Sequence, residues 1–596
     1  MKKKIFVLIL SVLLILSFTI PSFAYTNDIS DSGAYELITN TSVESDDVGT
    51  VFTKGNLPSK YSSRELNYTT PVKNQTGTNI CWAYSTLDTF ETLTLKNGEK
   101  IDGFSPSSLD IWAIKKDTGF GWQRNFNAAG STHIALSYLT SWNGPKSIID
   151  CPITINKEIA KSNNDKSKAV AFANSLTYVD CNNINSPKSA IYEYGAITAS
   201  FNYQKEYLNE ETSSYYTNLT RDEILQNPSG HSISIVGWDD NYPKTNFNSS
   251  LRPKNNGAWY CKNSYGEHWC NDGGYFWISY EDTSIFTNIF GKTIAITDYL
   301  MNDGTYTINQ VEEYGATGHI GHGLREDSTS DSSTMIYMNI LDFSEDSTIL
   351  KKVNFETEKE NLPFSVYYVP INADGTISQN IDEWTCLKDN CITDHIGYHS
   401  IDIDSFNIPV NETYDSKTNT FKGGIAIRFT VTKEEAASIG IDISINPTVK
   451  KEGVLSLIPD AKKNTSFVID DSLKSVTDLF DIIASSPAYD IYYYYDEGKE
   501  IGRAPNPYGA NFVIKAITKN ETFDMYGDTD GNTVVDILDA TCIQKYLAEL
   551  ISLDKTAILR GDANGNKVTD IIDAQTIQKY LANIPTKNVI GQKVEK

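Results

Sequence analysis

Apolar residues recur with a helical period over residues 82–96, a stretch that holds neither Gly nor Pro. The face that repeats most clearly is formed by Ala83, Leu87 and Phe90. Asn97-Gly98 follows directly, and this pair is a suitable C-terminal cap. The pattern therefore predicts a helix that ends near Lys96 and carries Cys81 in its first turn.

From about Ile289 to Thr518 the pattern changes to short apolar segments separated by turns of Asn, Asp, Gly and Pro. The clearest segments are Phe364–Val369, Gly424–Val431 and Asp490–Tyr495. They are rich in β-branched and aromatic residues, which predicts an all-β sandwich. Aromatic strands can also present a platform for carbohydrate, but packing in the sandwich core is the favoured interpretation.

Near the other end of the chain, an acidic loop and the helix after it occur twice, 34 residues apart from Asp528 to Asp562. Each loop places oxygen-bearing side chains at positions 1, 3, 5, 9 and 12, with a backbone carbonyl at position 7. A hard cation that takes six to eight oxygen ligands suits this spacing, so we predict two Ca²⁺ sites. The expected ligands are Asp528, Asp530, Asn532, Val534 (carbonyl), Asp536 and Asp539 in the first loop, and Asp562, Asn564, Asn566, Val568 (carbonyl), Asp570 and Asp573 in the second.

The N-terminus has the pattern of a cleaved secretion signal. Lys2–Lys4 precedes the apolar run Ile5–Ile20, and a small-residue step ends at Ala24. The run is shorter than the roughly 20 residues of a membrane-spanning helix, so a membrane anchor is the less favoured interpretation. We assign residues 1–24 to the signal and the polar residues 25–56 to a short pro-segment or linker.

Length and charge limit the function classes. The 596 residues carry a formal charge of −25, which indicates a multi-domain chain and argues against a nucleic-acid partner. The eight cysteines do not indicate a disulfide scaffold at this size. Three pairings stay open from spacing alone: Cys151 with Cys181, Cys261 with Cys270, and Cys386 with Cys391.

Four polar residues fit the chemistry of a thiol nucleophile. Cys81 opens the predicted helix, and a thiol needs a helix N-terminus or a neighbouring cation to ionise near neutral pH. His231 offers an imidazole for that purpose, and Asn263 offers a side-chain carbonyl that orients the imidazole. Gln75, six residues before the cysteine, offers an amide donor for a tetrahedral oxyanion. Each residue alone is more often structural, but together and in this order they predict nucleophilic catalysis.

The segments around these residues resemble papain-like cysteine proteases. The matching segments are Pro71–Gln75, Cys81–Ser85, Gly230–Ile233 and Trp259–Gly266. The resemblance implies an α+β domain with a helical half that carries Cys, a β-rich half that carries His and Asn, and a cleft between them. It also implies that Gly130 pairs with the substrate backbone. Two positions depart from the family: Thr78 replaces a disulfide cysteine, and Tyr265 replaces the usual Trp.

We place this catalytic domain at residues 57–288 and the β-sandwich at residues 289–518. A papain-like domain followed by a β domain resembles bacterial cysteine proteases that carry a lectin-like domain. The resemblance therefore leaves carbohydrate as a candidate partner of the middle domain.

The duplicated calcium loops resemble a type I dockerin, which we place at residues 522–586. This resemblance implies a small α domain that binds a cohesin module of a scaffold protein. Position 6, normally Gly, is Thr533 in one loop and Lys567 in the other. Positions 10 and 11, which help to select the cohesin within the family, are apolar in both halves as Ile537-Leu538 and Ile571-Ile572.

Together these features predict a secreted, extracellular cysteine endopeptidase, held on a cellulosome-like scaffold or at the cell surface, with two Ca²⁺ ions and no cofactor for catalysis. Two alternatives stay open. One is a catalytically silent adhesion or inhibitor-docking protein, and the other is a peptide-ligating or self-processing acyl-transferase.

Overall fold

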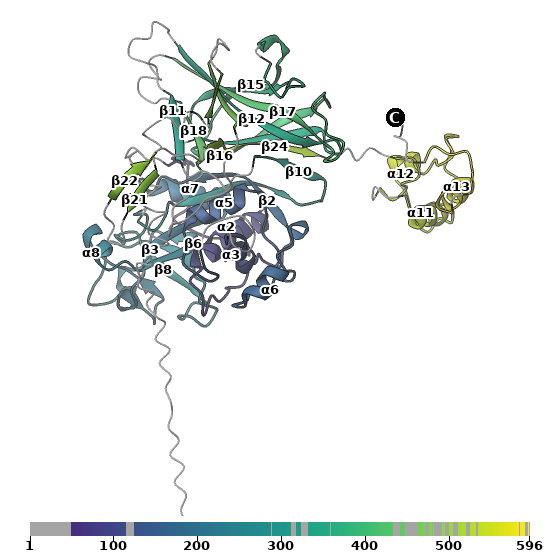
Figure 1. Cartoon of the computed structure of the whole chain (residues 1–596). Coiled ribbons are helices and arrows are strands. Elements are labelled where there is room, and N and C mark those ends of the chain that lie inside the picture. Colours follow the sequence, from purple (N-terminus) through teal and green to yellow (C-terminus); the bar gives the residue numbers. More distant parts are fainter. Residues whose placement is uncertain are drawn as a thin grey trace, which may run out of the picture. The chain divides into compact units, whose positions relative to one another are not determined.

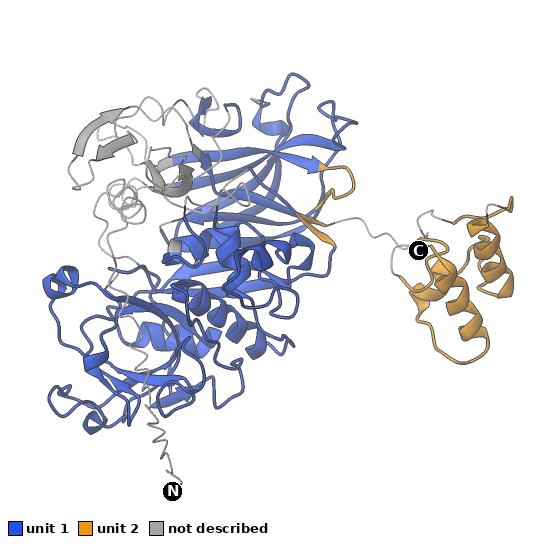
Figure 2. Ribbon diagram, turned by 60° about the horizontal axis from the view of Figure 1, so that its bottom comes forward, with its two compact units in different colours: residues 1–304, 308–343, 350–517 blue, residues 305–307, 344–349, 518–596 orange. Residues whose placement is uncertain are grey.

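The computed structural model describes most of the chain after residue 48. The described residues are 49–114, 124–287, 289–311, 318–322, 332–357, 359–378, 380–432, 441–447, 463–470, 476–479, 481, 491–494, 500–504, 510–519, 525–531, 535–582, 584–590 and 594. The predicted signal therefore lies outside them. Two compact units are present (Figure 2): the first extends to residue 517, and the second holds residues 305–307, 344–349 and 518–596. No helix in the described part of the chain has the length and apolar character that crossing a membrane requires.

The helical part of the first unit is organised around α2 (Cys81–Lys96), whose bounds agree with the sequence pattern. The structure buries every residue from Trp82 to Thr94, not one face alone. Helices α3 and α5 contact α2, as does strand β6 (Figure 1). The other helices of this part are α3 (Pro106–Trp112), α5 (Thr132–Thr140), α6 (Lys157–Ser162), α7 (Asn185–Tyr194) and α8 (Arg221–Gln226), with short 3₁₀ turns η1 (Lys166–Lys168), η2 (Lys205–Tyr207) and η3 (Lys244–Asn246). A helix buried on all sides must find internal partners for its polar side chains.

The strands of this part are β1 (Lys60–Ser62), β2 (Ala171–Tyr178), β3 (Ile197–Asn202), β4 (Leu208–Asn209), β5 (Ser214–Tyr215), β6 (Gly230–Asp239), β7 (Ala258–Lys262), β8 (Tyr275–Ser279) and β9 (Ile294–Met301). Strand β6 is central, because it pairs antiparallel with β3, β7 and β1. Its apolar residues face a core that includes Ile233, Ile235 and Trp238. Residues 49–54 lie against the same part, where the Thr50 amide donates to the Tyr178 carbonyl at 2.8 Å.

The sandwich expected after residue 289 is present. Its strands are β10 (Tyr306–Asn309), β11 (Gly318–His322), β12 (Ser332–Ser344), β13 (Ile349–Thr357), β14 (Pro363–Val369), β15 (Thr385–Ile392), β16 (Gly397–Asn407), β17 (Thr420–Thr432), β18 (Ile441–Pro447), β19 (Ser466–Asp470), β20 (Val476–Asp478), β21 (Ile491–Tyr494), β22 (Glu500–Ala504), β23 (Ala510–Phe512) and β24 (Ile514–Lys519), with the 3₁₀ turn η4 (Ile381–Glu383). The three segments chosen from sequence become β14, β17 and β21. One sheet has the order β15-β14-β17-β12-β19-β20. The core against it holds Tyr337, Phe355, Phe364, Phe429 and Ile514.

The second sheet of the sandwich continues into the helical part of the unit. Its order runs β10-β24-β13-β16-β2-β9-β3-β6-β7-β8-β5-β4. The join is the antiparallel pair of β16 and β2, where Gly397 lies opposite Thr177 and Tyr398 opposite Leu176. Strand β9 begins just after the expected domain boundary, yet it pairs with β2 along its length. The two domains expected from sequence thus share one hydrogen-bonded sheet.

The second unit contains the duplicated helices α11 (Ile537–Leu547) and α13 (Ile571–Leu581). A third helix, α12 (Lys555–Arg560), was not expected, although Asp554 caps its N-terminus through a bond from the Ala557 amide at 2.7 Å. The core of this unit is small and holds Ala540, Ile543, Ala563, Ala574, Ile577 and Ile590. Such a core gives little stability by itself, so bound ions would matter for folding.

Candidate active site

Cys81 is the first residue of α2, and its N-cap Ile80 offers no side-chain hydrogen bond to the helix end. The first amide groups of the helix are therefore left for another acceptor. The thiol is half-buried and contacts both the backbone and the hydroxyl of Ser232, the neighbour of His231 on β6. The fold thus brings the predicted nucleophile to the strand that carries the predicted base.

His231 and Asn263 are joined by a hydrogen bond. His231 is the second residue of β6, and Asn263 directly follows β7, the antiparallel neighbour of β6. Nε2 of His231 lies 2.8 Å from Oδ1 of Asn263, which also accepts from the Ser264 amide at 2.7 Å. Because Oδ1 can only accept, Nε2 carries a proton and Nδ1 is left as the basic nitrogen. Tyr265 stacks on the imidazole with ring centroids 4.8 Å apart.

Gln75 is held beside the same residues through Ser264. The Gln75 amide N–H donates to the Ser264 carbonyl at 2.7 Å, and the Ser264 hydroxyl donates to Gln75 Oε1 at 2.6 Å. The Gln75 side-chain NH₂ makes one long bond, 3.4 Å to the Thr78 carbonyl, so it keeps capacity to donate elsewhere. Sequence reasoning did not single out Ser264, although its place directly after Asn263 was the available signal.

Gly130 lies against the indole of Trp82, the residue after the cysteine. A Cβ at this position would lie 2.6 Å from Cε2 of Trp82, so only glycine lets the backbone around residue 130 pass this close to the indole. The segment before Gly130 is anchored by the buried ion pair of Arg124 with Asp110, and Arg124 also donates to the Ala128 carbonyl. This anchor, too, was missed from sequence.

Four buried charges connect the three segments that carry the predicted catalytic residues. Lys73, two residues before Gln75, lies 2.6 Å from Asp88 and 2.7 Å from Glu91 on α2. Lys262, the residue before Asn263, lies 3.0 Å from the same Asp88 oxygen. All four side chains are at most 6% exposed. Although burial alone would raise the pKa of Asp88, the two ammonium groups hold it below its ordinary value.

Burial acts on the thiol and the imidazole in opposite directions. It raises the pKa of Cys81 and lowers the pKa of His231 to about 4. Each shift disfavours a lone charge in the site. Transfer of the thiol proton to His231 instead forms both charges together, where they attract each other, so we expect the two groups to ionise as a pair.

The two acidic loops of the second unit share one hydrogen-bond pattern. In the first, Asp539 accepts from the amides of Asp530 and Asp536, and in the second, Asp573 accepts from those of Asn564 and Asp570. Asp536 and Asp570 also cap α11 and α13, a role that sequence analysis did not assign. Carboxylate oxygens of Asp528, Asp530 and Asp539 lie within 4.8 Å of one another.

The other expected ligands fit this pattern in part. Asp562 accepts from the amides of Asn566 and Lys567, at 2.9 and 2.7 Å, and Val568 follows in the same loop. Lys567 has φ of 70°, as expected for a residue in the place of a glycine. Burial raises the pKa of Asp539 and Asp573, so these oxygens would gain from a cation. Asn532, Thr533 and Val534 lie outside the described residues.

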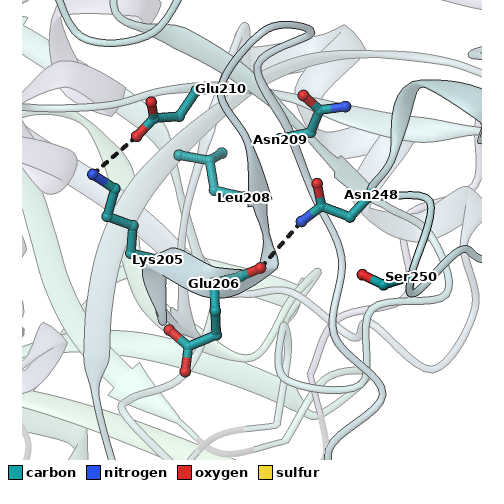
Figure 3. A pocket seen from close by; sticks show the side chains of 7 residues that line it. All are labelled: Lys205, Glu206, Leu208, Asn209, Glu210, Asn248 and Ser250. Carbon is teal, nitrogen blue, oxygen red and sulfur yellow. Dashed lines mark hydrogen bonds and ion pairs between the residues drawn. The ribbon is translucent and has the colours of Figure 1, made fainter.

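A surface depression of about 750 Å³ is formed near η2 and β4 (Figure 3). It is lined by Lys205, Glu206, Leu208, Asn209, Glu210, Asn248 and Ser250. Lys205 pairs with Glu210 across it at 3.1 Å. None of the four predicted catalytic residues lines this depression, so its polar side chains are separate from the thiol chemistry.

Comparison with known proteins identifies both functional regions. Residues 57–292 match the family described as papain family cysteine protease, and residues 526–582 match the dockerin type I domain. Residues 57–292 form a papain-family cysteine protease domain. Residues 526–582 form a type I dockerin domain.

Curated relatives agree at modest identity. Cathepsin K of Mus musculus is 25% identical over 37% of this chain and 59% of its own length. The viral cathepsin of Heliothis zea nuclear polyhedrosis virus is 24% identical over 36% of this chain and 51% of its own length. The chain thus spans between half and three-fifths of these relatives.

Solved structures extend the likeness beyond the protease domain. The cysteine protease and lectin-like domains of Cwp84, a surface layer associated protein of Clostridium difficile, superpose with a TM-score of 0.64 at 26% identity. That match covers 83% of this chain and 96% of the Cwp84 chain. A Cwp84 variant after propeptide cleavage gives a TM-score of 0.61 at 27% identity, over 78% and 100% of the two chains. A match of this extent includes the sandwich after the protease domain.

The charge network predicts a large loss of stability in Asp88→Asn. This change leaves Lys73 and Lys262 buried with one carboxylate fewer, and removing one partner of a buried pair costs about 3–5 kcal/mol. Glu65→Gln is the matched control, because it removes an exposed ion pair with Lys60 that is worth less than about 1 kcal/mol. Urea unfolding followed by tryptophan fluorescence measures both. Equal losses would show that the network does not hold the protease domain together.

The coupled ionisation predicts how Cys81 reacts with iodoacetamide. In His231→Gln the thiol must ionise alone, and burial holds its pKa above the ordinary 9.0. Its alkylation at pH 7 should therefore slow by ~10-fold or more, with a midpoint above pH 9, because only the thiolate reacts. His268→Gln, which changes an exposed histidine, is the control. Rates are followed by peptide mass spectrometry, and an unchanged pH profile in His231→Gln would contradict the pairing.

Proposed function

We propose that this protein is a secreted cysteine endopeptidase that hydrolyses peptide bonds through Cys81, His231, Asn263 and Gln75. The observation that carries the proposal is the hydrogen-bond chain His231–Asn263–Ser264–Gln75 beside a thiol at the start of α2. Each residue of this hydrogen-bonded series has a use in acyl transfer. A purely structural site would not need these residues in this order.

The proposed reaction begins with transfer of the Cys81 proton to Nδ1 of His231. The thiolate sulfur attacks the substrate carbonyl carbon, and the resulting oxyanion accepts bonds from the Cys81 amide and the Gln75 side-chain NH₂. His231 then gives its proton to the leaving amine, which releases the first product and leaves a thioester. Water, deprotonated by His231, attacks the thioester and frees the acid product with the thiol restored.

The fold also supplies supports for binding and orientation. Gly130 lies against Trp82 with no side chain in the way, so its backbone can pair with an extended peptide. Tyr265 covers the His231–Asn263 bond and excludes water from it. Aromatic residues of β14 and β17 such as Phe364 and Phe429 are buried in the sandwich core, which favours packing over a carbohydrate platform on these strands.

We further propose that the dockerin domain binds a cohesin module of a scaffold protein. Two Ca²⁺ ions would bind in the dockerin loops and stabilise this domain. Support comes from the exposed apolar residues at the start of both repeated helices. Ile537, Leu538, Ile571 and Ile572 are each more than half exposed. Apolar side chains exposed in equivalent places on a small domain are typical of a protein-binding surface. A scaffold partner and the signal-like apolar run at residues 5–20 both support the proposal that the protein is secreted.

The catalytic proposal predicts distinct losses for each residue. Cys81→Ala should abolish peptide hydrolysis while substrate still binds. Gln75→Ala should lower kcat by ~10²–10³ through loss of one oxyanion donor. Asn263→Ala should lower kcat with little change in KM, because His231 keeps its base but loses its orientation. Gln226→Ala, at the exposed end of α8, is the matched control.

A peptide library with product mass spectrometry measures these losses and separates the alternatives. Turnover by purified Cys81→Ala would refute the assignment of the nucleophile. Peptide binding without hydrolysis by the unaltered protein would instead support the silent docking protein. Products extended by an added amine, in place of free acids, would identify a transferase.

Calcium removal should act on the dockerin domain alone. Chelation leaves Asp528, Asp530 and Asp539 repelling one another in a unit with a small core, so this unit should unfold while peptidase activity persists. Asp528→Ala with Asp562→Ala should abolish cohesin binding. Ile537→Ser with Ile571→Ser should change the cohesin preference but keep calcium, whereas Leu550→Ser, which changes a still more exposed apolar side chain, should change neither.

Calorimetry of the full chain with Ca²⁺, followed by cohesin titration, measures these effects. The absence of calcium-dependent heat would refute the two sites. Calcium binding without capture of any cohesin would refute the partner but not the ions.

A further inference from the structure

A second group of metal-binding side chains lies in the sandwich region. Asp394, His395 and His399 each direct one ligand atom to a common point, and these atoms lie within 4.8 Å of one another. The catalytic thiol chemistry uses none of the three. Asp394 and His395 directly precede β16 and His399 lies within it, where the sheet of the sandwich joins β2 of the protease domain.

Contacts from the part of the unit before residue 288 fix this segment. The Thr177 hydroxyl on β2 donates to the Ile396 carbonyl at 2.7 Å, and the Ile396 amide donates to the Thr50 hydroxyl at 2.7 Å. The two imidazoles lie with ring centroids 4.2 Å apart and are buried, at 9% and 2% exposure. The rings are therefore held in place before any ligand arrives, as a binding site requires.

The hydrogen bonds of His399 determine which of its nitrogens is free. Nε2 lies 2.9 Å from the Thr357 hydroxyl, and that hydroxyl donates its own proton to the Lys359 carbonyl at 2.9 Å. The Thr357 oxygen must then accept from Nε2, so Nε2 is protonated. In the neutral ring the lone pair is on Nδ1, which faces Oδ1 of Asp394 at 3.7 Å.

The outer nitrogen of His395 is fixed in the same way. Nε2 lies 3.2 Å from the Tyr398 carbonyl, which can only accept a proton. The Ser175 hydroxyl nearby donates to the same carbonyl, so it too is left to accept. Nδ1 of His395 lies 2.7 Å from Asp394 Oδ1, so either a proton on Nδ1 or a cation must lie between these two atoms; with Nε2 protonated, the neutral ring has its lone pair on Nδ1.

While both rings are neutral, two imidazole lone pairs and a carboxylate oxygen thus converge on one small region. A single proton on His395 would satisfy one contact and leave His399 facing the carboxylate without a donor. A metal ion satisfies all three, and the separations of 2.7 and 3.7 Å bracket the roughly 3.3 Å expected between neighbouring ligands of tetrahedral Zn²⁺. Outer nitrogens bound to a carbonyl and a hydroxyl are also usual for metal-ligating histidines.

We infer that Asp394, His395 and His399 form a site for a borderline divalent cation of the Zn²⁺ class. Imidazole ligands select such ions, whereas Ca²⁺ prefers six or more oxygens, as the dockerin loops offer. The Asp394 side chain is 84% exposed, so water has access to the remaining coordination positions. Glu360 interacts electrostatically with both Asp394 and His395 and adds negative charge that attracts a cation.

The place of the site gives it a structural role. A bound ion would link Asp394 and His395, which precede β16, to His399 within β16 while β16 pairs with β2, and would stabilise the join between the two regions. The ion would raise the free energy of unfolding only to the extent that it binds the folded chain more tightly than the unfolded chain.

The experiment uses the full-length Cys81→Ala protein, saturated with Ca²⁺, so that neither the catalytic thiol nor the dockerin loops compete for zinc. Titration with Zn²⁺ by calorimetry should show one site per chain, and the melting temperature of the unit that contains the protease domain should rise. His395→Gln with His399→Gln should remove that site and the rise. His268→Gln, an exposed histidine, should leave both unchanged.

Asp394→Asn is a second test that does not depend on whether the double-histidine variant folds, because the Asp394 side chain is exposed. It should weaken zinc binding by about tenfold or more, as loss of a ligand does. Co²⁺ in place of zinc should give an absorption spectrum without a thiolate charge-transfer band, since no sulfur is a ligand. Equal zinc binding in the double-histidine variant and the control would overturn the inference. A protein that binds no zinc would also overturn it, and would leave a protonated His395 paired with Asp394.

Discussion

The catalytic geometry depends on an arrangement of buried charges that take no part in the proposed reaction. Lys73 reaches Asp88 and Glu91 on α2 from the segment before the helix, and Lys262 reaches Asp88 from a segment 174 residues further along the chain. One segment carries Gln75 and the other carries Asn263, while α2 itself carries Cys81. Opposite charges buried without water hold their separations closely, because any displacement exposes an unpaired charge to a medium of low dielectric constant. The network therefore holds together three separate segments of the chain.

Sequence alone was sufficient for the features that local patterns encode. Helix α2, the cysteine at its start and the three segments chosen as strands all lie where residue periodicity placed them. The same holds for the duplicated helices. It was not sufficient for Ser264, Arg124 or the charge network, because each depends on a partner outside its own local pattern, from Asp110 at 14 residues from Arg124 to Gln75 at 189 residues from Ser264. Nothing in the sequence around Lys73 indicates an ion pair, because its partner Asp88 is brought beside it only by the fold.

The extent to which α2 is buried could not be predicted from the sequence either. The pattern of α2 indicates one apolar face, yet its polar residues from Thr86 to Thr94 are buried as well. Thr89 has a buried polar partner, the hydroxyl of Thr198 at 2.8 Å, and the hydroxyls of Thr92 and Thr94 donate to carbonyls of the helix itself, whereas the Thr86 hydroxyl has no partner among the described residues. A periodicity argument assumes that polar residues face water, and it fails for a central helix that is surrounded by hydrogen-bonding neighbours. The partition at residue 288 failed to reveal the shared sheet for a related reason, since strand pairing across a domain boundary leaves no local signal.

The shared sheet makes the two regions inseparable in a practical sense. Strand β2 has β9 on one side and β16 on the other, and both follow residue 288. A shortened protein that stops there would keep all four proposed catalytic residues but would leave both edges of β2 unpaired. Exposed strand edges with apolar side chains are sites where chains add to one another and aggregate. The sandwich thus serves the protease domain as a permanent edge cover, whatever else it binds.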